Sequence, residues 1–176
     1  LDQEPFRFIA HFISAIRVRF PDFGTNSISV LNNTPQDKLD LPALVTTIVN
    51  DIYENIPEHF ICVLDDYHLV EESEIVNQFV NRFLQDVDEN CHLIVSSRRL
   101  LSLADMPLLV ARNQVGGISF EEISFAAEEI QELLLKNYHL TINDQTAAEI
   151  TEQTEGWITG LLLSTQLLGD EIDERL

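Results

Sequence analysis

The most constraining feature of this chain is an apolar run that ends in two neighbouring carboxylates. Residues 60–64 read Phe-Ile-Cys-Val-Leu, and Asp65 and Asp66 follow directly. A strand that is apolar at every position is typical of a central strand in a parallel α/β sheet, where both faces are covered. Open α/β sheets bind ligands at the carboxyl ends of their strands. The sequence therefore predicts a buried parallel strand with two acids at a ligand-binding edge.

A second buried strand is predicted at residues 92–97, and the segment between the two strands has helical periodicity over residues 75–87, with Ser73 as its cap. The order strand, helix, strand is typical of a parallel βαβ unit. The second strand ends in Ser-Ser-Arg-Arg at residues 96–99. Parallel neighbours would therefore bring carboxylates and a guanidinium to one edge of the sheet, as a phosphate and metal site requires.

The rest of the chain divides near residue 120. Before that point, periodicity predicts a helix that ends near Pro21 and another that Pro57 stops, whereas residues 25–32 fit helix and strand equally well and residues 114–119 suggest a short strand. After it only helices are expected, including one over 145–155 capped by Asp144 and ended by Gly156, and a last one over 158–168. We expect a partial α/β domain over residues 1–120 and a helical subdomain over 121–176.

Composition excludes several functions. With 10 basic and 30 acidic residues the chain carries a formal charge of −20, which disfavours direct binding to nucleic acid or to anionic membranes. There is no apolar run of about 20 residues and no signal-peptide pattern, so a cytoplasmic location is expected. Cys62, Cys91 and the scattered histidines lack metal-ligand spacing, which predicts reduced thiols and no zinc site.

Four segments together resemble a known family. Two of them end the predicted strands, at residues 63–70 (VLDDYHLV) and 93–98 (LIVSSR); the others lie at 123–129 (ISFAAEE) and 154–161 (TEGWITGL). In this order they resemble the ATPase core of MalT-like regulators, which are LuxR-type transcriptional activators of the signal-transduction ATPase class called STAND. The acids then correspond to the Walker B segment of that core. The resemblance covers essentially the whole chain and implies that residues 25–32 are helical.

The resemblance also implies function. In this family, binding of ATP with an inducer drives assembly of an active oligomer, and a separate helix-turn-helix domain binds DNA. By position, Asp65 would coordinate Mg²⁺ through water, Asp66 would orient the attacking water, and Arg98 would reach the terminal phosphate. The full-length protein would then be a STAND-type ATPase. We expect this part of it to make no direct contact with nucleic acid.

The chain departs from the family pattern in two places. No G-x-x-x-x-G-K-[ST] phosphate loop occurs in its 176 residues, and Ile158 stands where the family commonly has proline. The loop is expected upstream of Leu1, so the chain looks like a fragment with a partial P-loop-type sheet. Alone it should neither bind ATP and Mg²⁺ tightly nor hydrolyse ATP, and sheet edges left bare should cause self-association.

Other readings of the same residues remain open. The acids could cap a turn, Arg98 could form a structural ion pair with either aspartate, and Trp157 could be a packing anchor between helices. The chain as a whole could be a protein-interaction scaffold without a nucleotide role. It could also be a freestanding hydrolase that uses both acids with a metal, although no further ligands or general acid are evident.

Overall fold

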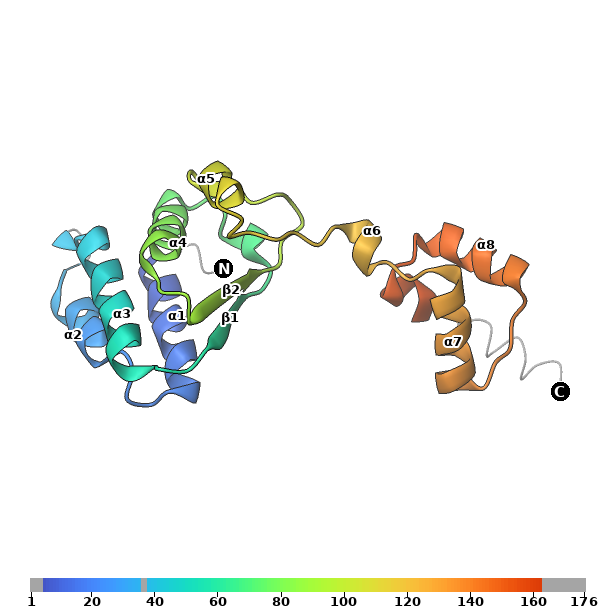
Figure 1. The fold of residues 1–176 in the computed structure, drawn as a ribbon, viewed down its shortest axis with the longest axis horizontal. Helices are drawn as coiled ribbons and strands as arrows, with labels where there is room; N and C mark the ends of the chain where they lie inside the picture. Colours follow the sequence, from blue (N-terminus) through green and yellow to red (C-terminus); the bar gives the residue numbers. More distant parts are fainter. Residues whose placement is uncertain (1–4, 36–37, 163–176) are drawn as a thin grey trace. The chain divides into compact units, whose positions relative to one another are not determined.

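The computed structural model describes residues 5–35 and 38–162 of the chain. It consists of two compact units, Leu1–Val115 and Gly116–Leu176, which are drawn in Figure 1. Each unit has a hydrophobic core of its own. No helix among the described residues is long and apolar enough to cross a membrane.

The first unit alternates helices with two strands. Its elements are α1 (Pro5–Arg19), α2 (Thr25–Asn33), α3 (Leu41–Asn55), β1 (Phe60–Leu64), the 3-10 helix η2 (Tyr67–Leu69), α4 (Glu74–Asp86), β2 (Cys91–Val95) and α5 (Met106–Ala111). The predicted helices and strands up to residue 97 are confirmed, and residues 25–32 are helical as the resemblance implies. Helix α5 was not predicted, because Pro107 suggested a break; proline is tolerated here because it lies in the first turn.

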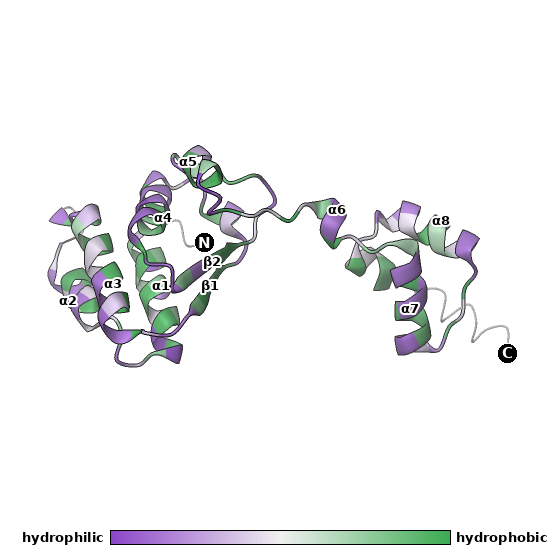
Figure 2. Ribbon diagram, in the orientation of Figure 1, coloured by the Kyte–Doolittle hydropathy of each residue, from purple (hydrophilic) through white to green (hydrophobic). Residues whose placement is uncertain are grey.

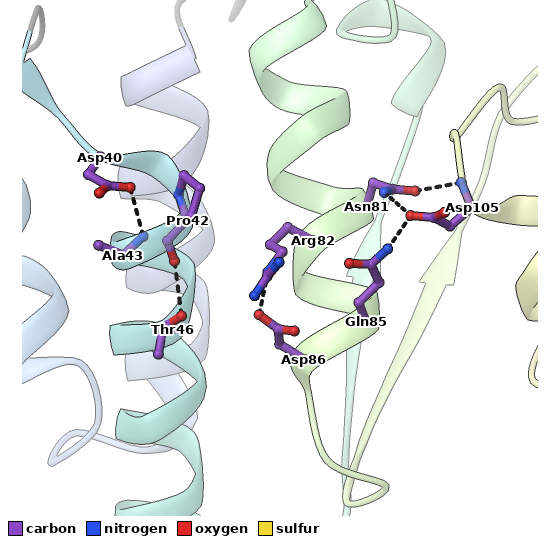
Figure 3. Close-up of polar contacts among 9 residues, drawn as sticks. All are labelled: Asp40, Pro42, Ala43, Thr46, Asn81, Arg82, Gln85, Asp86 and Asp105. Atoms are coloured by element: carbon purple, nitrogen blue, oxygen red, sulfur yellow. Dashed lines mark hydrogen bonds and ion pairs between the residues drawn. The ribbon is translucent and has the colours of Figure 1, made fainter.

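The helices begin at caps that the sequence supplies locally. The Ser73 side chain accepts from the Val76 N–H and opens α4, which confirms the predicted cap. The Asp40 carboxylate accepts from the Ala43 N–H at 3.1 Å and opens α3 (Figure 3). Each cap satisfies a backbone donor that has no partner within its helix.

Helix α2 is capped from a distant part of the chain instead. Its N-cap residue is Gly24, which has no side chain to offer. The Asp51 carboxylate of α3, only 1% exposed, accepts from the Ser27 N–H at 2.8 Å and from the Ser27 hydroxyl at 2.5 Å. Asn26 donates to its other oxygen at 2.8 Å. A buried carboxylate thus satisfies the start of α2 and fastens it to α3.

Strands β1 and β2 form a two-stranded parallel sheet, with Phe60 opposite Cys91 and Leu64 opposite Val95. The predicted βαβ unit is therefore confirmed. The helices α1, α3 and α4 all lie on the same side of the two strands (Figure 1). Their side chains form the core of this unit together with one face of the sheet.

The other face of the sheet is bare. Ile61 and Val63 are each 60% exposed and Ile94 is 52% exposed, although the strands are largely hydrophobic in Figure 2. The prediction that β1 is covered on both faces is therefore wrong for this structure. Both faces of an apolar strand can be buried only if other elements pack on both sides of the sheet. The described helices pack on one side alone.

The chain thus has a mixed α/β fold in which helices predominate. The strand predicted at residues 114–119 is wrong, because these residues have no regular structure and are exposed. Gly116 and Gly117 lie in open space, where a Cβ would meet no atom within 4 Å. A strand needs a partner for its backbone groups, and none of the described residues supplies one here.

The second unit contains only helices in its described part. These are α6 (Phe120–Ile123), α7 (Ala127–Tyr138), α8 (Asp144–Thr154) and a helical segment at residues 158–162. Its core comprises Ile130, Leu134, Ile150 and Leu161. The cap of α8 is Asn143, which accepts from the Thr146 N–H at 2.8 Å, and not Asp144 as predicted. Residues 163–168 of the last predicted helix lie outside the described residues.

Gly156 ends α8, as predicted, in a left-handed conformation with φ of 68°. Its carbonyl accepts from the Phe125 N–H at 2.9 Å. A Cβ at this position would lie 2.6 Å from the Phe125 carbonyl oxygen, so both the backbone angle and the close approach require glycine. Trp157, which follows, is 60% exposed and does not anchor the helices.

Candidate functional site

The carboxyl ends of β1 and β2 lie side by side. Beyond the last paired residues, the Ser96 N–H donates to the Leu64 carbonyl at 3.0 Å, and the Tyr67 N–H donates to the Ser96 carbonyl at 2.9 Å. The two polar strand ends therefore meet at one edge of the sheet, where a parallel arrangement was expected to bring them.

Ser96 connects the Asp65 carboxylate with the backbone of Asp66. Its hydroxyl donates to Asp65 Oδ1 at 2.5 Å and accepts from the Asp66 N–H at 2.9 Å. Asp66 itself adopts a left-handed conformation with φ of 50°. This uncommon backbone angle turns the chain sharply after β1. Both aspartates are exposed to solvent.

Cations contribute little at this edge. Arg98, two residues beyond Ser96, is exposed and forms no hydrogen bond or ion pair with any described residue. In its neighbour Arg99, the guanidinium Nη1 lies 3.4 Å from Glu71 Oε1. His68 Nδ1 lies 3.8 Å from Asp66 Oδ1, which is too long for a hydrogen bond. The structural ion pair between Arg98 and either aspartate is therefore not formed within the described part of the chain.

The turn that carries the acids is fixed to α4. The Tyr67 hydroxyl donates to Asn77 Oδ1 at 2.7 Å, and Asn77 donates to the Glu71 carbonyl at 2.6 Å. Tyr67 is only 2% exposed. Burial, with a smaller effect from the Glu71 charge, raises the pKa of Tyr67 to about 12, so its hydroxyl keeps its proton and remains a donor at neutral pH.

A groove of about 300 Å³ lies between α1 and β1. Its α1 side is formed by Phe8, His11, Phe12 and Ala15. Its other side is formed by residues 62–67, 69 and 70, so that Asp65 and Asp66 are among the residues that line a mainly apolar hollow. This groove could not be predicted from the sequence, because it depends on how α1 packs beside the strand.

The donor set suits metal ions that prefer oxygen ligands. Among the described residues no three His, Cys, Asp or Glu side chains come together as metal ligands. Burial raises the pKa of both thiols, that of Cys91 to about 12, so they are protonated at neutral pH and poor metal ligands. Two exposed carboxylates fit Mg²⁺, which is usually held by one or two carboxylates together with substrate phosphates.

Comparison with known proteins gives one consistent relationship. No family model matches the chain. It is 26% identical over 162 residues to the HTH-type transcriptional regulator MalT of Yersinia pestis (strain Pestoides F). The same identity over the same length is found with the MalT regulators of Yersinia pseudotuberculosis serotype O:3 (strain YPIII) and Vibrio cholerae serotype O1. Each alignment covers 92% of this chain but only 17% of the relative.

The sequence comparison points to a class of protein. The chain is similar to part of a transcription regulator, and the regulators that it resembles are MalT-like. The predicted resemblance to MalT-like regulators is thereby confirmed.

Proposed function

We propose that this chain is part of the STAND-class ATPase core of a MalT-like, LuxR-family transcription regulator in the cytoplasm. In that regulator, ATP binding would switch oligomerisation and so activate an attached DNA-binding domain, which is a form of signal transduction. The observation that carries the proposal is the parallel pairing of β1 with β2, which sets Asp65, Asp66 and Ser96 at one edge. That edge is where open α/β sheets take their ligands.

Each residue at this edge has a proposed role. Asp65, with one oxygen held by Ser96, acts as the Walker B acid that holds Mg²⁺ through water. Asp66, which is exposed at the turn after β1, orients the attacking water. Arg98, which is exposed, reaches the terminal phosphate. Mg²⁺, when bound, neutralises charge on the phosphates during transfer.

The isolated chain should be inactive. Phosphoryl transfer depends on positioning and on neutralising charge, and a phosphate loop supplies much of both. The 176 residues contain no such loop, and they carry a formal charge of −20 that repels a triphosphate. Calorimetric titration of this chain with MgATP should therefore give no binding in the micromolar range. Micromolar binding would contradict the proposed dependence on the loop.

A longer protein that contains this chain together with a phosphate loop tests the proposed roles directly. There Asp66→Asn should lower ATP turnover by about 100-fold or more with ATP affinity retained, as loss of a water-positioning group does. Asp65→Asn should raise the Mg²⁺ concentration needed for half-maximal turnover. Glu72→Gln changes an exposed acid that follows the same turn and serves as the control. Wild-type turnover in the Asp66 variant would overturn the assignment.

An interaction scaffold without nucleotide is a second candidate. The observation in its favour is the bare apolar face of the sheet, formed by Ile61, Val63 and Ile94, since exposed apolar patches mark interaction sites. A longer reading frame without a phosphate loop, or one whose Asp65 and Asp66 variants behave as the wild type, would support it over the ATPase.

A further inference from the structure

Every polar group of Ser96 bonds to the turn that carries the two acids. The Ser96 N–H donates to the Leu64 carbonyl at 3.0 Å, and the Tyr67 N–H donates to the Ser96 carbonyl at 2.9 Å. The Ser96 hydroxyl accepts from the Asp66 N–H at 2.9 Å and donates to Asp65 Oδ1 at 2.5 Å. The residue directly after β2 therefore contacts each of the residues 64–67 and holds them in place.

The direction of the two hydroxyl bonds follows from the chemistry of their partners. A backbone N–H can only donate, so the hydroxyl accepts from Asp66 and keeps its single proton for another group. An ionised carboxylate can only accept, so this proton goes to Asp65. The Ser96 hydroxyl therefore acts on the Asp65 carboxylate.

Asp65 Oδ1 also receives a second donor. The Asp66 N–H lies 3.1 Å from this oxygen, so it is shared between Asp65 and Ser96. A carboxylate oxygen offers about two acceptor positions, and both positions on Oδ1 are then used. No described residue forms a hydrogen bond or ion pair with Asp65 Oδ2, and this side chain is exposed. One oxygen of the carboxylate is thus occupied and the other is open.

The two hard cations that bind carboxylates differ in how they use them. Ca²⁺ takes carboxylates through one or both oxygens in a flexible geometry, whereas Mg²⁺ dehydrates reluctantly and usually keeps several waters. A carboxylate with only Oδ2 open cannot bind an ion through both oxygens. It offers one contact, either to the ion or to a water of its shell. The arrangement at Asp65 therefore suits Mg²⁺ better than Ca²⁺.

We propose that Ser96 determines cation specificity at this edge: by occupying Asp65 Oδ1 it limits the carboxylate to a one-oxygen contact and so favours Mg²⁺ over Ca²⁺. The inference rests on the proposed function, which sets the cation at Asp65. Ser96 is a positioning residue, since it acts on the cation only through Asp65. Without its hydroxyl one position on Oδ1 becomes free, so that both oxygens could contact Ca²⁺.

Cation affinity tests the proposal without relying on ATP turnover. The protein is a longer one that contains this chain together with a phosphate loop, with a nonhydrolysable ATP analogue bound. Competition with Mn²⁺, followed by electron paramagnetic resonance, gives the dissociation constants of Mg²⁺ and Ca²⁺. Ser96→Ala should shift the ratio of these constants by about 10-fold in favour of Ca²⁺, as changes behind a metal ligand typically do. Ser96→Thr keeps the hydroxyl and should retain the wild-type ratio.

Ser97→Ala is the matched control. The Ser97 hydroxyl accepts from the Arg99 N–H at 3.4 Å and bonds to neither acid, so this variant should keep the wild-type ratio. An unchanged ratio in Ser96→Ala, or the same shift in both alanine variants, would overturn the inference. Binding of Mg²⁺ by the wild type would then leave the proposed function standing. A wild-type protein that binds neither cation with the analogue would overturn both.

Amide hydrogen exchange in the chain itself tests the contact without any cation. Ser96→Ala removes one of the two acceptors of the Asp66 N–H, so this amide should exchange about 10-fold faster. The Tyr67 N–H bonds to the backbone carbonyl of residue 96, which the substitution keeps, so its exchange should not change. Equal acceleration of both amides would mean that the variant loosens the whole strand end, which would contradict a specific role of the Ser96 hydroxyl.

Discussion

The two faces of the β1–β2 sheet differ far more in their surroundings than in their composition. On one face, Cys62 and Cys91 are buried below α1 and α4, where Phe12 lies 5.3 Å from Phe79 between ring centroids in an edge-to-face contact. On the other face, the equally apolar Ile61 is 60% exposed. Hydrophobicity therefore decides that a residue can be buried, and the packing of distant helices decides whether it is.

The difference separates stability from interaction. A two-stranded sheet is marginal by itself, so the first unit depends on the covered face and its helices. The bare face contributes little to the folding of this unit. The following predictions test this separation, beginning on the covered side.

The largest effect is expected in the centre of the helical core. Phe79 of α4 is fully buried and contacts the rings of Phe8, Phe12 and Phe83. Phe79→Ala removes these contacts and leaves a cavity, which should lower the free energy of unfolding by about 3–5 kcal/mol. Urea denaturation followed by circular dichroism measures the change.

Leu100→Ala is the control for this experiment, because Leu100 is 97% exposed and its truncation should change the free energy of unfolding by less than about 0.5 kcal/mol. If the two variants were equally stable, the covered face would not be the source of stability, and the comparison of the two faces would fail.

A smaller loss is expected when the buried polar contact of the same layer is removed. Asp51→Ala leaves the N–H and hydroxyl of Ser27 without their acceptor, and Ser27 is fully buried. Unsatisfied buried donors should lower the free energy of unfolding by about 2–3 kcal/mol. Hydrogen exchange should show faster opening at the first turn of α2 than in α4.

Asp51→Asn keeps one acceptor oxygen and should cost less than the alanine variant. An Asn variant that is no more stable than the Ala variant would mean that the charge of the carboxylate, and not its ability to accept hydrogen bonds, fastens α2 to α3.

Much of this layer could be predicted from local sequence. Helical spacing, Pro57 and Ser73 fixed the limits of α3 and α4 because each acts on the backbone near it. Helix α2 could not be settled locally, because its cap is Asp51, 24 residues away from Ser27. The bare face of β1 was missed for a related reason: its residues look buried, and only the position of the helices shows that they are not.

The candidate site also has one part that the sequence predicts and one part that it does not. The meeting of Asp65 and Asp66 with Ser96 follows from parallel pairing, which the order strand, helix, strand already indicates. The contact of Tyr67 with Asn77 and the exposed position of Arg98 depend on side-chain geometry, which periodicity does not reveal.

The smallest effects are expected from one substitution made on each face of the sheet. Val95 packs against the core on the covered face, and Val63 is 60% exposed on the bare one. Val95→Thr puts a hydroxyl into a largely apolar contact and should lower the free energy of unfolding by about 1 kcal/mol. Val63→Thr keeps a β-branched side chain in water and should change it by less than about 0.5 kcal/mol.

The unfolding of both threonine variants should be measured at low protein concentration. Any association through the bare face would otherwise add stability that depends on concentration. Equal losses in the two variants at low concentration would mean that the bare face is covered in solution, and the contrast between the two faces would disappear.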